Sequence, residues 1–125
     1  MPEKAALREW SLYLQDMQGF CQKVIRYTTG LTGAEFERNE LVYDAVLRNL
    51  ELLGEATKQI PEHVRERHPD VPWRRIAGLR DVLAHAYFGL ESATIWQVVS
   101  SSVPALSQQL QDVARAEGLP SPNSP

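Results

Sequence analysis

The sequence has a single cysteine and no long apolar run. One thiol, Cys21, forms no disulfide within the chain, and we expect it to be a small core residue. No apolar stretch approaches the roughly 20 residues that cross a bilayer. The first residues also lack the basic and apolar sections of a signal peptide. We therefore expect a cytoplasmic protein that does not engage a membrane.

The patterns of several familiar binding sites are also missing. The chain shows no alternating strand pattern, no phosphate-binding glycine loop and no CxxC pair. His63 and His68 are one residue too far apart for the i, i+4 pairing of a helical metal site, and we expect both at the surface. No Ser–His–acid arrangement is readable. The sequence therefore predicts neither a metal site nor a cofactor.

Basic charge is scarce overall but concentrated in one segment. The net charge of −3 counts against a nucleic-acid partner, because phosphate-binding proteins usually carry a basic face. Between residues 73 and 88, however, Arg74, Arg75 and Arg80 stand against one acid, Asp81. The acids concentrate elsewhere, for example between residues 35 and 55. An anionic ligand would therefore bind at the segment 73–88.

Apolar residues recur every three or four positions through most of the chain, which predicts helices. Thr32 and Glu35 resemble a capping box at the start of a short helix, and Pro104 is expected to kink or split the last long helix. The expected long helices cover about 3–28, 40–59, 73–88 and the residues from Ser92 onward, and the short ones cover 33–38 and 61–67.

These helices define the predicted fold class and domain organisation. We expect an all-α fold, an antiparallel bundle of four long helices with one or two short helices, because short connections join neighbours of opposite direction. Residues 1–117 form the single helical domain, and residues 118–125 form a disordered tail rich in proline and serine. Asn49 lies inside the apolar stripe of the second long helix. Its amide either bonds to a neighbouring helix or shapes a binding site.

The most informative segment is Gly78–Gly89, which carries Arg80, His85 and Tyr87 at the end of an apolar helical pattern. Arginine holds a phosphate through a forked, permanently charged contact. Histidine moves protons near neutral pH. Tyrosine adds a hydroxyl donor and a flat ring that stacks on a base. Together these groups have the chemistry to cleave a phosphodiester without a metal ion.

The helical spacing of these residues makes the site incomplete in one straight helix. Arg80 and Tyr87 lie on nearly one line and are able to bracket a phosphate. Asp81 is positioned to pair with His85 across an i, i+4 step and to fix its tautomer. His85 lies about 140° around the helix from Arg80. Either the helix unwinds near Ala86, or a second copy in a two-fold homodimer completes the site, and we favour the dimer.

Each of these residues also has a simpler interpretation. An arginine at a helix edge is commonly solvated or salt-bridged, a histidine near a helix C-terminus often caps it, and a tyrosine before glycine is often packing. In that case the chain is an ordinary structural bundle. Alanine at Arg80, His85 or Tyr87 would then leave function intact.

The segments around the motif strengthen the functional interpretation. The spacing Arg80-x4-His85-x-Tyr87 resembles the signature of HepT-like toxins in the HEPN superfamily, and the likeness extends over nearly the whole chain. The matching flanks are Arg48–Glu51, Leu53–Ala56, Ile60–Pro61, Pro72–Asp81, Ile95–Trp96 and Pro104–Leu106.

The resemblance implies an α-helical, dimeric, metal-independent endoribonuclease, the toxin of a toxin–antitoxin pair. Arg80 and His85 would be the catalytic residues, with Asp81, Tyr87 and Asn49 in supporting positions. The implied partners are RNA, a second copy, and a small MntA-like nucleotidyltransferase antitoxin that silences the toxin by attaching AMP to Tyr87. The alternative is a non-catalytic helical module that binds nucleotide or scaffolds the nucleotidyltransferase.

Overall fold

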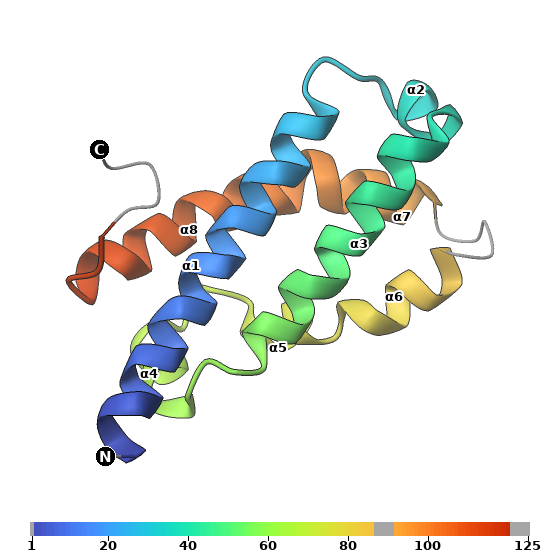
Figure 1. Ribbon diagram of the computed structural model, residues 1–125. Helices are drawn as coiled ribbons and strands as arrows, with labels where there is room; N and C mark the ends of the chain where they lie inside the picture. Colours follow the sequence, from blue (N-terminus) through green and yellow to red (C-terminus); the bar gives the residue numbers. More distant parts are fainter. Residues whose placement is uncertain (1, 87–91, 121–125) are drawn as a thin grey trace.

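The protein is a bundle of helices (Figure 1). The computed structural model describes the backbone of residues 2–86 and 92–120, and the side chains of residues 10–86 and 92–120. The helices of this part are α1 (Pro2–Thr28), α2 (Gly33–Arg38), α3 (Glu40–Thr57), α4 (Glu62–Arg67), α5 (Trp73–Ala77), α6 (Leu79–Ala86), α7 (Ser92–Gln97) and α8 (Val103–Ala116). The predicted all-α fold with four longer helices, here α1, α3, α6 and α8, is confirmed.

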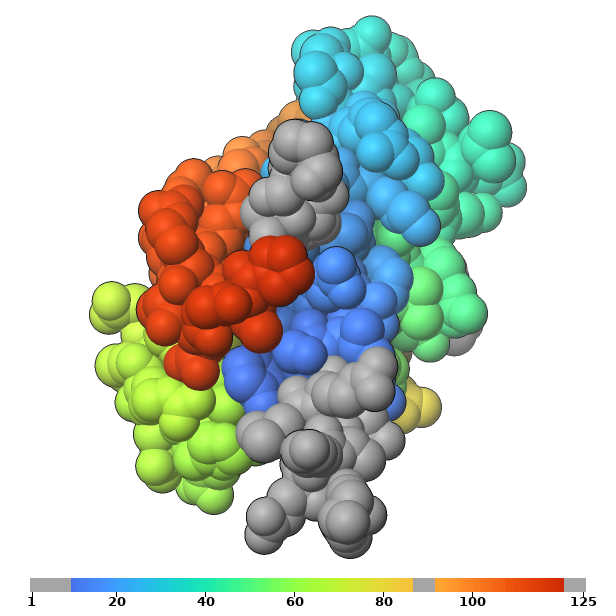
Figure 2. Space-filling view, turned by 60° about the vertical axis from the view of Figure 1, so that its left-hand side comes forward, coloured from blue at the N-terminus to red at the C-terminus, as the bar shows by residue number. Residues whose placement is uncertain are grey.

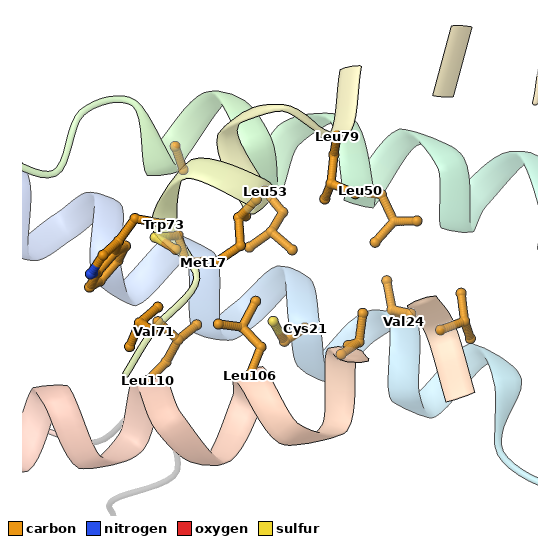
Figure 3. Packing of buried hydrophobic residues seen from close by; sticks show 14 of the residues in the cluster. Met17, Cys21, Val24, Leu50, Leu53, Val71, Trp73, Leu79, Leu106 and Leu110 are labelled. Atoms are coloured by element: carbon orange, nitrogen blue, oxygen red, sulfur yellow. The ribbon is translucent and has the colours of Figure 1, made fainter. Parts of the chain in front are cut away.

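The core lies between α1 and its two neighbours, α3 and α8. Side chains from the three helices meet in one apolar layer (Figure 3). Cys21 of α1 is fully buried, as predicted, and burial raises the pKa of its thiol to about 12, so it stays protonated and unreactive at neutral pH. The layer contains Met17, Cys21 and Val24 from α1, Leu50 and Leu53 from α3, and Leu106 and Leu110 from α8. None of the described helices is long and apolar enough to cross a membrane.

Local capping fixes where the early helices begin. The predicted capping box at α2 is confirmed, because the Glu35 amide donates to Thr32 Oγ1 at 3.1 Å and the Thr32 amide donates to Glu35 Oε1 at 2.9 Å. These bonds also hold the pKa of the Glu35 carboxyl below its usual value. Asn39 starts α3 in the same way, with its Oδ1 accepting from the Val42 amide at 3.1 Å.

The helix predicted over residues 73–88 is broken at Gly78, so the single-helix prediction is wrong there. α5 ends at Ala77 and α6 begins at Leu79. Glycine is the weakest helix former after proline, so the break falls at the residue that costs least. The turn also lies close to α3, because a Cβ placed on Gly54 would lie 3.1 Å from the Ile76 carbonyl oxygen. The glycine at position 54 therefore allows α5 to approach α3.

The last long helix is divided just before Pro104, as its sequence predicts. A π-helical turn spans Val98–Ser102, and the Val103 amide donates to the Val98 carbonyl instead of the carbonyl one residue later. Pro104 has no amide hydrogen and clashes with a regular helix before it, so the chain widens by one residue per turn at this point. The Ser100 hydroxyl donates to the Trp96 carbonyl at 2.7 Å.

The end of α8 is closed by a glycine turn. The Leu119 amide donates to the Ala114 carbonyl at 2.8 Å and the Gly118 amide donates to the Arg115 carbonyl at 3.2 Å. Gly118 adopts a φ of +72°, which glycine tolerates best, and Leu119 packs against the core. The first residues of the predicted tail thus serve as the helix cap, and residues 121–125 lie outside the described part.

A charged cluster joins the α4 region to the end of α8. Arg67 donates to Glu117 at 2.8 and 3.0 Å, and His68 Nε2 lies 2.7 Å from the same carboxylate. In Figure 2 the yellow-green α4 region lies against the red end of α8. His68 is half-buried in this cluster, so its predicted surface position is wrong, whereas His63 is exposed as predicted. We call Arg67, His68 and Glu117 the clamp.

Candidate functional site

The motif residues lie on the outer face of α6. Leu79, Leu83 and Ala86 are buried and attach this helix to the bundle. The opposite face of α6 carries Arg80, Asp81, Ala84 and His85, all of them exposed. A helix of 3.6 residues per turn places these two sets on opposite sides. The local sequence therefore presents an arginine, a carboxylate and an imidazole to solvent from one short helix.

None of the three polar motif residues is paired within the described part of the chain. Arg80, Asp81 and His85 form no hydrogen bond or ion pair with any residue that the structure describes. The anticipated contact between Asp81 and His85 is not formed, because both side chains are exposed and water solvates them at least as well. As far as the described residues go, these three groups are available to an external ligand.

The helix stays regular to its last described residue. α6 continues to Ala86, so unwinding does not bring Arg80 and His85 together before that point. On a regular helix they remain about 140° apart. Tyr87 and Gly89, the other two motif positions, lie outside the described residues.

Asn49 lies in the apolar stripe of α3, but its hydrogen-bond partner is not the expected one. The side chain is buried, with 8% exposed, and its Nδ2 donates to the Ala45 carbonyl at 2.8 Å. The partner is thus in the preceding turn of α3 itself, and the expected bond to a neighbouring helix is not made. An amide satisfied by its own helix costs little to bury, and this bond does not reach α6.

A tyrosine that sequence reasoning did not single out touches the end of α6. The Tyr43 hydroxyl donates to the Ala86 carbonyl at 3.4 Å, a long hydrogen bond to one of the carbonyls that a helix end leaves free. Its ring packs on Phe36, with centroids 5.1 Å apart, and Phe36 packs on Trp96 at 5.3 Å. Burial and the nearby carboxylates of Glu37 and Asp44 raise the pKa of Tyr43, so the hydroxyl stays protonated. No sequence spacing links residues 43 and 86.

Two further cations next to the motif are also unpaired. Arg74 and Arg75 of α5 are exposed and form no hydrogen bond or ion pair with the described residues. By contrast, Arg65 donates to the Thr57 and Ile60 carbonyls at the end of α3, at 2.8 and 2.9 Å. Together with Arg80, the segment presents three guanidinium groups that have no partner within residues 10–86 and 92–120, and such groups bind phosphate oxygens bidentately.

The arrangement is suited to chemistry on a polyanion. A guanidinium neutralises charge that develops on a phosphate, and an exposed imidazole transfers protons to or from a hydroxyl. Among the described side chains, no group of three or more His, Cys, Asp or Glu residues gathers closely enough to hold a metal ion. The residues present therefore offer acid–base and electrostatic catalysis.

Comparison with known proteins agrees with this arrangement. The sequence profile of a family described as "Ribonuclease HepT-like" matches residues 17–113, which include every described motif residue. No solved structure gives a significant match.

Several relatives are similar over nearly their full length. A protein of Caldanaerobacter subterraneus named "Putative RNase" is 35% identical over 105 residues, covering 84% of this chain and 94% of the relative. A Methanocaldococcus jannaschii protein with the same description is 32% identical over 108 residues, covering 86% and 93%. The "Probable ribonuclease HepT" of Thermococcus cleftensis is 33% identical over 103 residues, covering 82% and 94%. The chain belongs to the HepT-like ribonuclease family.

Proposed function

We propose that this protein is a metal-independent endoribonuclease that cleaves RNA at a cleft between two copies of the chain. The observation that carries the proposal is the exposed, unpaired set of Arg80, Asp81 and His85 on α6. Buried or salt-bridged groups would have a structural explanation, and among the described residues nothing pairs with these three. Membership of a family whose relatives are named as ribonucleases supports RNA as the substrate.

Each motif residue has a role in this chemistry. Arg80 binds the scissile phosphate and stabilises the charge that builds on it during attack. His85 acts as general base or general acid for the neighbouring 2′-hydroxyl, a contribution of roughly 10²–10⁴-fold. Asp81 pairs with His85 when the substrate orders the site. Asn49 supports α3, against which α6 packs.

The second copy follows from the geometry of α6. Arg80 and His85 diverge around a helix that stays regular to Ala86. A two-fold axis beside this face brings Arg80 of one copy near His85 of the other. The resulting cleft binds a single RNA strand between two unpaired arginines.

Control of the enzyme is proposed to act on Tyr87. This residue directly follows Ala86, the end of α6, so its hydroxyl is close in sequence to both catalytic residues. A nucleotidyltransferase antitoxin that transfers AMP to this hydroxyl places bulk and negative charge where the RNA phosphate binds. The modified protein is then silent, which makes the unmodified protein the toxin of a toxin–antitoxin pair.

The direct test is cleavage of labelled single-stranded RNA in the presence of a chelator. We expect wild-type protein to cut and the His85→Ala variant to be inactive with unchanged folding. A 2′-deoxy nucleotide at the cut site should block the reaction, because attack needs the neighbouring hydroxyl. Cleavage by His85→Ala, or of the deoxy substrate, contradicts the mechanism. Tight nucleotidyltransferase binding without any cleavage favours the non-catalytic module instead.

The regulatory part has its own test. Tyr87→Phe removes the acceptor hydroxyl and keeps the ring, so this variant should retain RNA cleavage and take up no AMP from the partner enzyme. Mass spectrometry after incubation with ATP and the nucleotidyltransferase measures the outcome. An AMP adduct on Tyr87→Phe would place the acceptor elsewhere.

A further inference from the structure

An apolar groove borders α6 on the side opposite Arg80. It has a volume of about 420 Å³ and lies between the α5–α6 segment and the π-helical turn with α8. This volume falls within the roughly 300–1,000 Å³ typical of small-molecule sites. Its walls are mainly aliphatic and include Leu79, Val82, Val98 and Leu106. A solvent-facing hollow with such walls costs free energy unless something occupies it.

The groove adjoins the catalytic face. Val82 lines the groove, and His85 follows it by three residues, so the two side chains are surface neighbours on α6. At another part of the rim lies Arg75, one of the unpaired cations. The groove therefore includes a guanidinium able to hold a phosphate, and His85 lies one helical turn beyond its Val82 wall.

The rim also carries groups suited to the edge of a base. The Asp70 carboxylate is exposed and accepts hydrogen bonds. Gln109 donates its Nε2 to the Asp70 backbone carbonyl at 2.9 Å, which leaves Oε1 of the same amide as a further acceptor. Ser102 adds a hydroxyl at the same rim. Apolar walls with acceptors at one edge match a nucleobase that presents N–H groups.

We infer that the groove is a nucleobase subsite for the nucleotide next to the cleaved phosphate, which lies between His85 of the same copy and Arg80 of the second copy, with Arg75 binding a backbone phosphate of that RNA. The inference rests on the proposed ribonuclease function and adds a source of sequence preference to it. RNA is favoured as the occupant because the groove carries both N–H acceptors and Arg75, a cation without a partner among the described residues, and because its Val82 wall lies one helical turn from His85. A purely apolar occupant would leave Arg75 and Asp70 without partners.

Filling the groove tests the inference. Ala105 lines it from an exposed position on α8, so Ala105→Trp blocks it without removing a core side chain. Ala116→Trp places the same ring at an exposed site near the other end of α8, outside the groove. Cleavage of a randomised single-stranded RNA pool by wild-type protein should show a base preference at one position beside the cut. Ala105→Trp should lose that preference and raise KM about tenfold, the equivalent of about 1.4 kcal/mol, because the apolar contact with one base is lost, and Ala116→Trp should keep both.

Arg75→Gln gives a second readout that leaves the apolar walls intact. Binding of a non-cleavable 2′-deoxy strand should weaken, and the slope of log K against log salt should fall by about 0.7, the value for one phosphate contact on a single strand. A control Arg115→Gln variant removes another exposed charge, which lies 3.8 Å from Asp112 at the end of α8, and should leave the slope unchanged.

The outcomes separate this inference from the function on which it rests. If wild-type protein cuts RNA and Ala105→Trp keeps both its base preference and its KM, the groove does not hold a base. If Ala105→Trp instead converts a dimer to a monomer in sedimentation, the groove is an interface between copies, and the inference is overturned. If His85→Ala still cuts, the ribonuclease proposal itself fails, whichever groove variant is used.

Discussion

The clamp and the catalytic face are built from the same three kinds of side chain, an arginine, a histidine and a carboxylate. In the clamp, Glu117 accepts bonds from Arg67 and His68 at 2.7–3.0 Å. On α6 the corresponding groups of the motif share no bond. Figure 1 shows the two regions well apart, with α4 and the end of α8 on one side and α6 on the other.

The difference shows that pairing, more than residue type, decides what such a trio does. Bonds from Arg67 and then His68 lower the pKa of the Glu117 carboxyl to about 2, so its charge is committed to holding α4 against α8. An unpaired trio gains nothing for the fold, and its charge is free to act on a ligand. Mutations should therefore change stability in the clamp and activity on α6.

The largest effect is expected on the catalytic face. Arg80→Ala and His85→Ala should each lower the rate of RNA cleavage by at least about 100-fold, the lower end of the contributions of a charge-stabilising donor and of a general acid–base group. Their midpoints of urea unfolding should match wild type, because neither side chain has a partner in the part of the chain that the structure describes. The contrast is sharpest with His68→Ala, which should lower the unfolding midpoint and keep the cleavage rate. Full activity in either α6 variant would erase the proposed distinction.

A smaller effect, on stability alone, is expected in the clamp. Glu117→Gln removes the charge that Arg67 and His68 both bind. We expect the free energy of unfolding to fall by roughly 1–2 kcal/mol, a value already reduced because water screens the half-exposed Arg67. Urea denaturation monitored by circular dichroism measures it. An unchanged unfolding midpoint would show that the clamp is only a surface contact.

The clamp should also be visible in the pH dependence of stability. The pKa of Glu117 is lower in the folded protein than its usual 4.5, so its contribution is complete above about pH 4.5 and is lost as pH falls towards 2. The difference in unfolding free energy between wild type and Glu117→Gln should therefore be constant near neutral pH and shrink in acid. A difference that stays constant from pH 6 down to pH 2.5 would contradict this assignment.

The smallest effect is expected for an ordinary surface ion pair. Arg48 lies 3.5 Å from Glu51, and both side chains are well exposed. Arg48→Gln should change the free energy of unfolding by less than about 0.5 kcal/mol. Measured alongside Glu117→Gln, it tests whether burial and bidentate geometry, and not charge pairing alone, make the clamp stabilising.

Much of the fold follows from periodicity and local chemistry in the sequence. The apolar stripes, the Thr32–Glu35 capping box and the disruption before Pro104 all depend on residues within one or two turns of each other. The break at Gly78 was missed because an apolar stripe continues across it, whereas the turn depends on how closely α5 approaches Gly54 of α3.

For the site, the sequence predicted which residues share the outer face of α6 but not their surroundings. The partner of Asn49, the half-buried position of His68 and the contact of Tyr43 with Ala86 each depend on packing or side-chain rotamers. The contact of His68 with Glu117 and the contact of Tyr43 with Ala86 join residues that are 43 or more positions apart in sequence. Helical spacing carries no information at that distance.

The most direct measurement is the activity of mixed dimers. Arg80→Ala and His85→Ala chains that carry different tags are co-expressed. The cleavage rate is measured for the co-expressed mixture and for the mixed dimer, which is purified through both tags. If each site takes Arg80 from one copy and His85 from the other, the mixture should recover about a quarter of wild-type cleavage, because about half the dimers are mixed and each has one of two sites intact. A mixture as inactive as either variant alone would contradict a catalytic site shared between two copies.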